Sequence, residues 1–411
     1  MAKRDHIVVG LDIGTTKICA IVAEVSEEGS INIVGVGSSP SRGLKKGVVI
    51  DIESTVESIK KAVDDAALMA GAEINSVYTG IAGSHIAGVR SRGVVALKKQ
   101  EVTRADVQRA VEAAHSRAVL DPDRRVLHVI PREFIVDDQD GIHEPLGMSG
   151  TRLEVDVHII TGAVTSAQNI IKSVNRAGLD VIDIVLQPLA SSEAVLSQEE
   201  RDLGVAMVDL GGGTTDLAIF VDGSIQHTTV LPIGGQNLTK DIAIGLLTSP
   251  TEAEKIKIRQ GIARVELVRD GEQVEVPSVG DRLGRTISRR ELAEIIEPRV
   301  EEMFDLVRRE IALNGYEGML GAGVVITGGT SMLEGMPDAA ERVLNLPARR
   351  GAPHGVEGLR DIAGTPMHAT AVGLILHACH HADRAEIGRV RGSRRAGRVF
   401  GRMREWMLEF F

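Results

Sequence analysis

Two short apolar runs in this 411-residue chain are each followed by the same kind of turn. The run at residues 7–11 leads into the turn 12–17 (DIGTTK), and the run at residues 205–208 leads into the turn 209–216 (DLGGGTTD). Uninterrupted apolar runs of this length predict buried strands. Each turn therefore begins with an aspartate at the end of a strand, and the repeat predicts a duplicated α/β fold.

The spacing of apolar residues also predicts elements between the two turns. Ser54 and Glu57 match a capping box, and the apolar positions that follow them recur at helical spacing. Thr165 is expected to cap a second helix. A strand over residues 180–186 is then interrupted at Pro188, where a helix is expected to cross between the halves.

Residues 84–162 differ in character from the segments on either side. Thr103 opens a predicted helix, and the stretches 132–136 and 153–160 are strand-like around a loop that contains glycine and proline. Because this segment interrupts the predicted sheet of the first half, we interpret it as an inserted small domain.

The composition limits the class of protein. With 43% hydrophobic residues the chain can bury a large core, and the formal net charge of −10 disfavours nucleic acid as a partner. Cys19 and Cys379 are the only cysteines, which is typical of a reducing compartment. No apolar run approaches the roughly 20 residues that span a bilayer, and no signal peptide precedes the first strand. A cytoplasmic protein is therefore expected.

Both turns have the chemistry of a phosphate-binding site. Glycine lets backbone N–H groups come close to phosphate oxygens, and threonine hydroxyls add further donors. A carboxylate repels phosphate, so Asp12 and Asp209 are expected to flank a hydrated Mg²⁺ ion, while Asp216 holds or polarises the attacking water. Either turn alone is also compatible with an ordinary hairpin. The residues expected to bind phosphate are Gly14, Thr15, Thr16, Lys17, Gly211, Gly212, Gly213, Thr214 and Thr215.

Further glycines indicate where the rest of a nucleotide would lie. Gly235 opens a predicted helix, and Gly328 and Gly329 follow a predicted strand, so the backbone can approach adenine or ribose there. Glu254 and Lys257 lie one turn apart on a predicted helix, which is also compatible with a solvated ion pair. The sequence contains neither a P-loop nor a Gly-x-Gly-x-x-Gly after a strand, which disfavours two other nucleotide folds.

On these motifs the chain resembles the actin family of ATPases and, within it, the FtsA family of bacterial cell division proteins. The similar segments are the turn 12–17 (phosphate 1), Gln187 with Pro188 (first connect region), the turn 209–216 (phosphate 2) and residues 327–329 (adenosine). The resemblance implies an actin-like, two-lobed duplicated α/β fold with ribonuclease H-like halves.

The same resemblance implies a site between the halves that binds ATP and Mg²⁺. Gln187 would orient the attacking water, and Glu254 and Lys257 would hold the adenosine. The groups available to activate water are Asp12, Gln187, Asp209 and Asp216. Slow ATP turnover is expected, and the alternatives of an enzyme and a nucleotide-dependent assembly switch stay open.

The resemblance also divides the chain into subdomains. Residues 84–162 resemble the inserted subdomain, called IC, that distinguishes FtsA from actin and MreB. The remaining parts are subdomain IA at 1–83, 163–195 and 360–383, subdomain IIA at 196–227 and 304–359, and subdomain IIB at 228–303.

The function implied is that of a cell division protein that polymerises on the inner membrane, anchors FtsZ there and recruits later division proteins through subdomain IC. The FtsZ C-terminal peptide is expected to bind subdomain IIB. There Arg299 belongs to a cluster of arginines, a side chain that can pair bidentately with carboxylates.

The last residues change character twice. Residues 384–397 are rich in arginine and glycine and predict a flexible basic linker. If residues 398–411 are helical, they carry an apolar stripe opposite a charged face, which is typical of a helix lying on an anionic membrane surface. A helix docked on the body is the alternative. The stripe consists of Val399, Phe400, Met403, Trp406, Met407, Phe410 and Phe411.

That tail predicts a peripheral protein on the cytoplasmic face of the inner membrane, at the division site. One such helix gives reversible attachment, so polymerisation and membrane residence are expected to be coupled through avidity.

Other protein classes share parts of this pattern. A sugar kinase of the same fold needs a carboxylate base and a sugar pocket, which the sequence does not place. A heat-shock chaperone needs a β-rich domain after residue 380, and a pilus-assembly relative of actin is not expected to end in a membrane helix. A metal cluster of His377, Cys379, His380 and His381 is disfavoured, because these residues fit one ion only if the backbone changes direction.

Overall fold

Two sheets of the same plan form the body of the protein. The computed structural model describes residues 6–119, 121–277 and 284–385. The first sheet has the strand order β11-β6-β1-β2-β3-β19 and the second has the order β14-β13-β12-β17-β18. In each sheet an antiparallel three-stranded unit (β1-β2-β3, β12-β13-β14) continues into parallel strands (β6 and β11, β17 and β18). This repeated topology confirms the predicted duplication.

The strands of the first sheet are β1 (His6–Ile13), β2 (Lys17–Val25), β3 (Ile31–Pro40), β6 (Ser76–Ile81), β11 (Asp180–Leu186) and β19 (Glu357–Gly358). Those of the second sheet are β12 (Val205–Leu210), β13 (Thr215–Val221), β14 (Ser224–Leu231), β17 (Val324–Thr327) and β18 (Ala348–Arg350). Small two-stranded ladders are made by β4 (Leu44–Lys45) with β5 (Val48–Val49), and by β15 (Gln273–Val276) with β16 (Arg285–Ser288).

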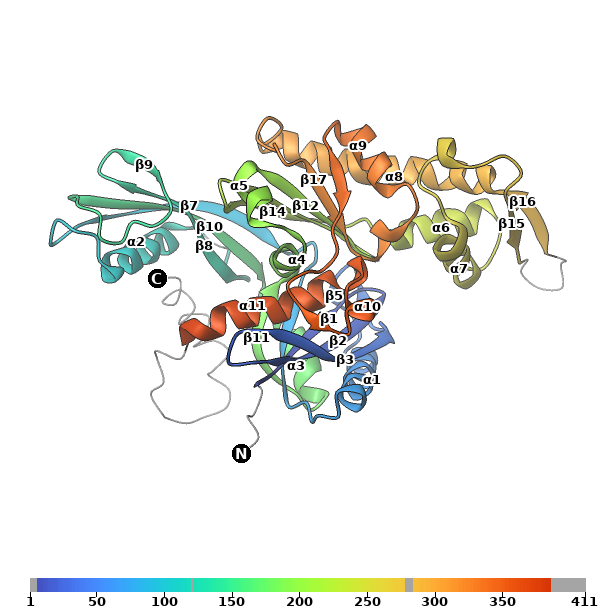
Figure 1. Ribbon diagram of the computed structural model, residues 1–411, viewed down its shortest axis with the longest axis horizontal. Coiled ribbons are helices and arrows are strands. Elements are labelled where there is room, and N and C mark those ends of the chain that lie inside the picture. The colour runs from blue at the N-terminus through green and yellow to red at the C-terminus, as the bar shows by residue number, and fades with distance from the viewer. Residues whose placement is uncertain (1–5, 120, 278–283, 386–411) are drawn as a thin grey trace.

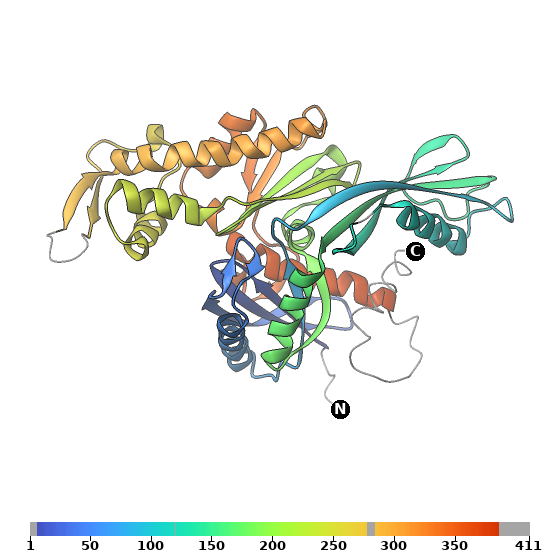
Figure 2. The same ribbon diagram turned by 180° about the vertical axis from the view of Figure 1, so that it is seen from behind.

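Helices cover both faces of each sheet. On the first sheet, α1 and α3 share a buried cluster with one face, and Figure 2 shows them on the outer side of the molecule. On the second sheet, α6, α8 and α9 contribute to the cluster of the outer face. The helices are α1 (Ile52–Ala70), α3 (Val164–Arg176), α4 (Gln187–Val195), α5 (Gln198–Leu203), α6 (Gly235–Gly245), α7 (Pro250–Gln260), α8 (Arg289–Leu313), α9 (Met336–Leu344), α10 (Arg360–Ala363) and α11 (Ala369–Ala385). Short 3₁₀ turns are η1 (Val265–Leu267), η2 (Gly329–Met332) and η3 (Pro366–His368).

The two lobes share a core at the level of α4 and α11. One buried cluster contains Ile21 of the first sheet, Met207 of the second, Ala194 of α4 and Ile375 of α11. Pro188 stands in the first turn of α4, where proline is tolerated, so the predicted break and crossing helix are confirmed. These two helices therefore fix the position of one sheet relative to the other.

Two predicted helix starts are wrong by a few residues. The N-cap of α1 is Asp51, whose carboxylate accepts hydrogen bonds from the Ser54 backbone N–H (3.3 Å) and hydroxyl (2.6 Å). α3 begins at Val164, because β10 runs into it without a break and the Val164 N–H is satisfied by the Asp123 carbonyl (3.1 Å). Thr165 is thus inside the helix that it was expected to cap.

The inserted segment is a separate sheet with one helix. Its strands follow the order β7-β10-β8-β9, and α2 (Arg104–Arg117) begins at Thr103 with the predicted cap, reinforced by Asp106. Strand β7 was not predicted, and only part of each of the two long strands was. The strands are β7 (Ala87–Ala96), β8 (Arg124–Val136), β9 (Gln139–Ile142) and β10 (Arg152–Ala163). Figure 1 shows this domain and the β15–β16 hairpin at opposite ends of the molecule.

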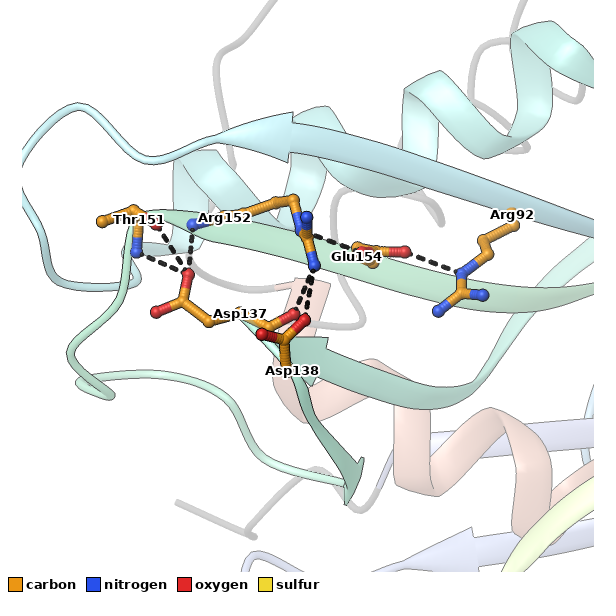
Figure 3. Close-up of polar contacts among 6 residues, drawn as sticks. All are labelled: Arg92, Asp137, Asp138, Thr151, Arg152 and Glu154. Carbon is orange, nitrogen blue, oxygen red and sulfur yellow. Dashed lines mark hydrogen bonds and ion pairs between the residues drawn. The ribbon is translucent and has the colours of Figure 1, made fainter.

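Charged side chains fix the end of the inserted sheet. Glu154 on β10 pairs with Arg92 on β7 (2.8 Å) and with Arg152 (2.9 Å) (Figure 3). The Asp137 carboxylate accepts from the Thr151 backbone N–H (2.9 Å) and hydroxyl (2.8 Å), which ties the β8–β9 turn to the start of β10. The opposite face of β10 carries apolar side chains that pack against α2.

Within the ranges that the structure describes, no helix is long and apolar enough to cross a membrane. Residues 384 and 385, predicted as linker, are the last residues of α11. The predicted membrane helix of residues 398–411, with its apolar stripe, lies outside the described residues.

Candidate functional site

The two predicted phosphate turns are hairpins of identical register. In the first, Asp12 of β1 pairs with Cys19 of β2, and the Gly14 N–H donates to the Lys17 carbonyl (3.0 Å). In the second, Asp209 of β12 pairs with Asp216 of β13, and the Gly211 N–H donates to the Thr214 carbonyl (3.0 Å). The two turns thus have the same backbone plan, one in each lobe.

The tips of the two turns contact each other across the lobes. A Cβ atom added at Gly213 would lie 2.8 Å from the Thr15 hydroxyl oxygen, and one added at Gly212 would clash with the side chain of Thr16. Glycine is therefore required at these positions by the opposite turn itself. Thr15 also accepts a hydrogen bond from the Gly47 N–H (3.0 Å), whereas the Thr215 hydroxyl donates to the Ile233 carbonyl (2.9 Å).

Side chains of α4 and α11 reach the aspartates at the base of the turns. The Gln187 amide donates to Asp12 Oδ1 (3.1 Å). The Ser191 hydroxyl donates to Asp209 Oδ2 (2.7 Å), and the Thr370 hydroxyl donates to the same oxygen (3.3 Å). The three predicted carboxylates and Gln187 therefore lie at one site.

The carboxylates share a buried, negatively charged environment. Burial raises the pKa of Asp12 to about 6; Lys17 opposes this shift and the charge of Asp209 adds to it. Burial also raises the pKa of Asp209, against the hydrogen bonds that it accepts. The pKa of Asp216 is raised well above its ordinary value by burial and by the other two carboxylates. A cation at this site would relieve the repulsion.

The site fits Mg²⁺ bound through water and phosphate oxygens better than Mg²⁺ bound by protein alone. Among the described residues, no three His, Cys, Asp or Glu side chains are grouped closely enough to hold a metal ion by themselves. Mg²⁺ in proteins usually keeps several waters and uses one or two carboxylates together with substrate phosphates. Asp216 Oδ1 is buried without a hydrogen-bond partner in the described part of the chain, so it can accept a bond from such a water.

Lys17 is held at the edge of the site by the segment before α11. Its ammonium group donates to the Met367 carbonyl (2.7 Å) and lies 3.4 Å from His368 Nδ1. Burial and the Lys17 charge lower the pKa of His368 to about 3, so this imidazole is neutral at pH 7. This contact could not be predicted from sequence patterns, because the partners are about 350 residues apart.

The predicted pair Glu254 and Lys257 forms on α7, where this helix contacts the start of α6. Lys257 is only 9% exposed and donates to Glu254 (2.8 Å), to the Thr239 hydroxyl (2.9 Å) and to the Gly235 carbonyl (3.1 Å). A Cβ at Gly235 would clash with the hydroxyl of Thr330. Lys257 is therefore a buried structural residue, whereas the side chain of Glu254 is 42% exposed, and the role of the pair toward adenosine stays a prediction.

The double glycine after β17 has two different environments. Gly328 has a φ of 84°, and a Cβ there would clash with Asp209 Oδ1. Around Gly329 the nearest atom to such a Cβ is 3.9 Å away. Only the second glycine thus leaves open space beside the backbone, whereas the first is required by Asp209.

Sequence reasoning missed the hydroxyls that hold the site together. Ser191 follows Gln187 by one helical turn, and this spacing could have indicated that both face the cleft. Thr370, Thr239 and Thr330 come from distant segments and have no such signal. The Thr330 hydroxyl donates to the Gly211 carbonyl (2.9 Å), which links the second turn to the segment after β17.

Two other candidate groups are engaged within the chain. Arg299 on α8 contacts both carboxylate oxygens of Asp241, through Nε (2.6 Å) and Nη2 (3.1 Å). His377 and His380 both bond to the partly buried Glu193, through Nδ1 at 3.0 and 2.9 Å. The side chain of His381 lies outside the described residues.

Comparison with known proteins gives the family. The model of "Cell division protein FtsA" matches residues 206–373, and that of the "SHS2 domain inserted in FTSA" matches residues 83–161. The cell division protein FtsA of Pseudomonas aeruginosa is 50% identical over 370 residues, which cover 90% of this chain and 88% of that protein.

Solved structures share the fold at low identity. A PilM–PilN type IV pilus biogenesis complex matches with a TM-score of 0.66 and 18% identity, over 90% of this chain and 98% of that chain. MreB 5 of Spiroplasma citri bound to AMPPNP matches with a TM-score of 0.58 and 14% identity, over 94% and 100% of the two chains. The predicted actin-like fold with an inserted subdomain is confirmed. From its identity to the relative in P. aeruginosa, the chain belongs to the FtsA family of cell division proteins.

Proposed function

We propose that the chain binds ATP with Mg²⁺ between its two opposed turns and serves as a nucleotide-dependent scaffold at the division site. The observation that carries the nucleotide proposal is the contact of two glycine- and threonine-rich hairpins next to three carboxylates, of which Asp209 and Asp216 are buried and Asp12 is partly buried. The shared fold of an MreB protein that binds AMPPNP supports a nucleotide as the ligand.

In this proposal each group has a distinct task. Backbone N–H groups of Gly212 and Gly213, with the hydroxyls of Thr15 and Thr16, bind the phosphates. Lys17 balances their charge. Asp12 and Asp209 would hold a hydrated Mg²⁺ ion by accepting hydrogen bonds from its waters, and the ion would supply positive charge to the phosphates. We expect adenosine to bind against Gly235, Glu254, Lys257 and the open backbone at Gly329. Gly235 and Gly329 are close in space, because the hydroxyl of Thr330, the residue after Gly329, lies next to Gly235.

Water activation is proposed to be weak. The Gln187 amide, which now donates to Asp12, can orient a water but cannot take its proton. Asp216 is a buried carboxyl with a raised pKa, and it is the group available to accept that proton. Slow hydrolysis is compatible with an assembly switch, in which the bound nucleotide controls polymerisation.

Family membership supports the division role. We infer that the protein polymerises, anchors the FtsZ C-terminal peptide through the region of Arg299, and recruits later division proteins through the inserted domain. Because Arg299 is already paired with Asp241, a peptide carboxylate must compete with that partner or bind beside it. The sequence of residues 398–411 supports peripheral attachment to anionic lipids on the cytoplasmic face of the inner membrane.

Recruitment of labelled FtsZ to anionic vesicles tests this function. With ATP and Mg²⁺, the full chain is expected to bring FtsZ to the vesicles, and a chain truncated after Gly397 is not. A truncated chain that recruits as well as the full one would contradict the tether. A full chain that binds vesicles without recruiting FtsZ would leave membrane attachment intact and refute the FtsZ partner.

A further inference from the structure

We infer that Ser191 and Thr370 are positioning residues that orient the Asp209 carboxylate toward the bound cation and set its place relative to Asp12. The inference rests on the proposed nucleotide site, and it concerns contacts made by helices that the phosphate motifs do not include.

The two hydroxyls and one carboxylate oxygen form a closed, buried triangle. Ser191 donates to Asp209 Oδ2 at 2.7 Å, Thr370 lies 3.3 Å from the same oxygen, and the two hydroxyl oxygens are 3.0 Å apart. All three residues are buried. Both hydroxyls donate to Oδ2, and the other oxygen, Oδ1, lies beside the bare Cα of Gly328.

Helix α4 also contacts the aspartate of the other lobe. Gln187, one turn before Ser191, donates to Asp12 Oδ1 (3.1 Å). Side chains one helical turn apart lie on one face. A single turn of α4 therefore holds the equivalent carboxylates of both hairpins.

Helix α11 is locked against α4 at the same level. A Cβ at Gly373 would overlap the carbonyl oxygen of Ala190, so the two backbones touch directly. Thr370 is one turn before Gly373 on α11, and its hydroxyl donates to Asp209. The close approach at Gly373 therefore fixes the position of this hydroxyl relative to α4. The α4–α11 pair is thus a common frame for Asp12 and Asp209.

Buried hydroxyls need partners in any fold, so a purely structural role is the competing explanation. The two explanations differ in what they predict for the metal. A structural contact changes the stability of the protein, whereas a positioning contact changes how much Mg²⁺ adds to nucleotide affinity.

The test compares Ser191→Ala and Thr370→Val with Ser192→Ala in the full chain. Ser192 is the matched control, because its buried hydroxyl is on the same helix and donates to the Pro188 carbonyl (2.6 Å). Affinity for a fluorescent ATP analogue is measured with Mg²⁺ and with EDTA, and Mn²⁺ binding to the protein–nucleotide complex is followed by electron paramagnetic resonance.

Loss of either positioning hydroxyl is expected to lower the Mg²⁺ enhancement and the Mn²⁺ affinity by about tenfold, the lower end of the range for outer-shell partners at metal sites. Ser192→Ala should leave the Mg²⁺ enhancement and the Mn²⁺ affinity unchanged. Thr370→Ser keeps the hydroxyl and should recover most of the affinity that Thr370→Val loses. Thr370→Val preserves side-chain shape, so it decides the question if Ser191→Ala does not fold.

Two failures are distinguishable. If the unmodified chain binds nucleotide no better with Mg²⁺ than with EDTA, the proposed metal–nucleotide site is wrong. If the unmodified chain shows the enhancement and both variants retain it within about twofold while their melting temperatures fall, the hydroxyls are structural and the inference is overturned.

Discussion

Cys19 and Asp216 occupy the same position in the two hairpins, each directly opposite the penultimate residue of the first strand, which is an aspartate in both. The duplicated site is therefore chemically asymmetric. Cys19 is buried 3.3 Å from His368 Nδ1, and burial raises the pKa of its thiol to about 11, so it carries no charge. The second lobe contributes two carboxylates and the first lobe only one.

This asymmetry predicts opposite effects of Asp216→Asn on the free and the liganded protein. Because the raised pKa of Asp216 means that folding disfavours its ionised form, stability is lost as pH rises above the ordinary value of 3.8. The variant should be more stable than the unmodified protein at pH 8 without ligand, by about 1–3 kcal/mol. Thermal unfolding with and without ATP and Mg²⁺ should then show a smaller ligand-induced shift.

Asp222→Asn is the control for charge alone, because Asp222 is exposed in the next turn of the same sheet. Asp222→Asn should change neither the stability of the ligand-free protein nor the ligand-induced shift in melting temperature. A destabilised ligand-free Asp216→Asn protein would contradict the assignment of Asp216 as an unsatisfied carboxylate.

The double glycine after β17 gives a prediction with an adjacent control. Gly328→Ala places a side chain at a φ of 84° and against Asp209, so we expect a loss of about 2–4 kcal/mol in unfolding free energy. Gly329→Ala meets no atom closer than 3.9 Å and should fold normally. If adenosine lies over Gly329, this second variant should still bind nucleotide more weakly. Chemical denaturation and nucleotide titration measure the two effects; equal stability of both variants would refute the steric account.

The hairpins could be predicted because their cause is local. An apolar strand followed by Asp-x-Gly or Gly-Gly favours a tight turn through its own residues, and the repetition of this pattern revealed the duplication. Strand β7 could not be predicted in this way. Its sequence, Ala-Gly-Val-Arg-Ser-Arg-Gly-Val-Val-Ala, lacks a clear apolar alternation, because glycines stand where α2 and His158 pack closely against the strand.

The contacts around Asp209 show a second limit of sequence reasoning. Ser191 and Thr370 are 179 positions apart, and only the packing of α11 on α4 brings them together. The start of α1 shows a third. Asp51 and Ser54 are both good N-caps, and the choice of Asp51 follows from its backbone N–H, which the Gly43 carbonyl already holds (3.1 Å).

Two lysines on α7 should differ sharply in their contribution to stability. Lys257 is buried with three acceptors, so Lys257→Met leaves polar groups unsatisfied and should cost about 2–4 kcal/mol. Lys255 makes an i,i+3 pair with Glu252 (2.7 Å) on the surface, and Lys255→Met should stay within about 0.5 kcal/mol. Urea denaturation measures both. Similar small losses would mean that the Lys257 pair is solvated, and its role toward adenosine would then become the main reason for its presence.

The clamp of Glu193 by two histidines predicts a pH-dependent stability of α11. The hydrogen bond to Glu193 raises the pKa of His380 above its ordinary value of 6.5. A raised folded-state pKa contributes stability that is fully present below pH 6.5 and is lost as pH rises through the folded-state value. The difference in unfolding free energy between the unmodified protein and His380→Gln should thus be larger at pH 6 than at pH 8.5. Because the side chain is 64% exposed, solvent screening limits this difference to at most about 1 kcal/mol.

Two controls separate this clamp from a general effect of histidine charge. His143→Gln removes an exposed histidine of the inserted domain and should show no pH-dependent difference. In a Glu193→Gln background the acceptor loses its charge, so the additional effect of His380→Gln should become independent of pH. Protection of the last turns of α11 against hydrogen exchange, taken relative to the intrinsic base-catalysed rate at each pH, should follow the same dependence and be lower at high pH. A His380→Gln difference of equal size at both pH values would show that the contact is an uncharged hydrogen bond.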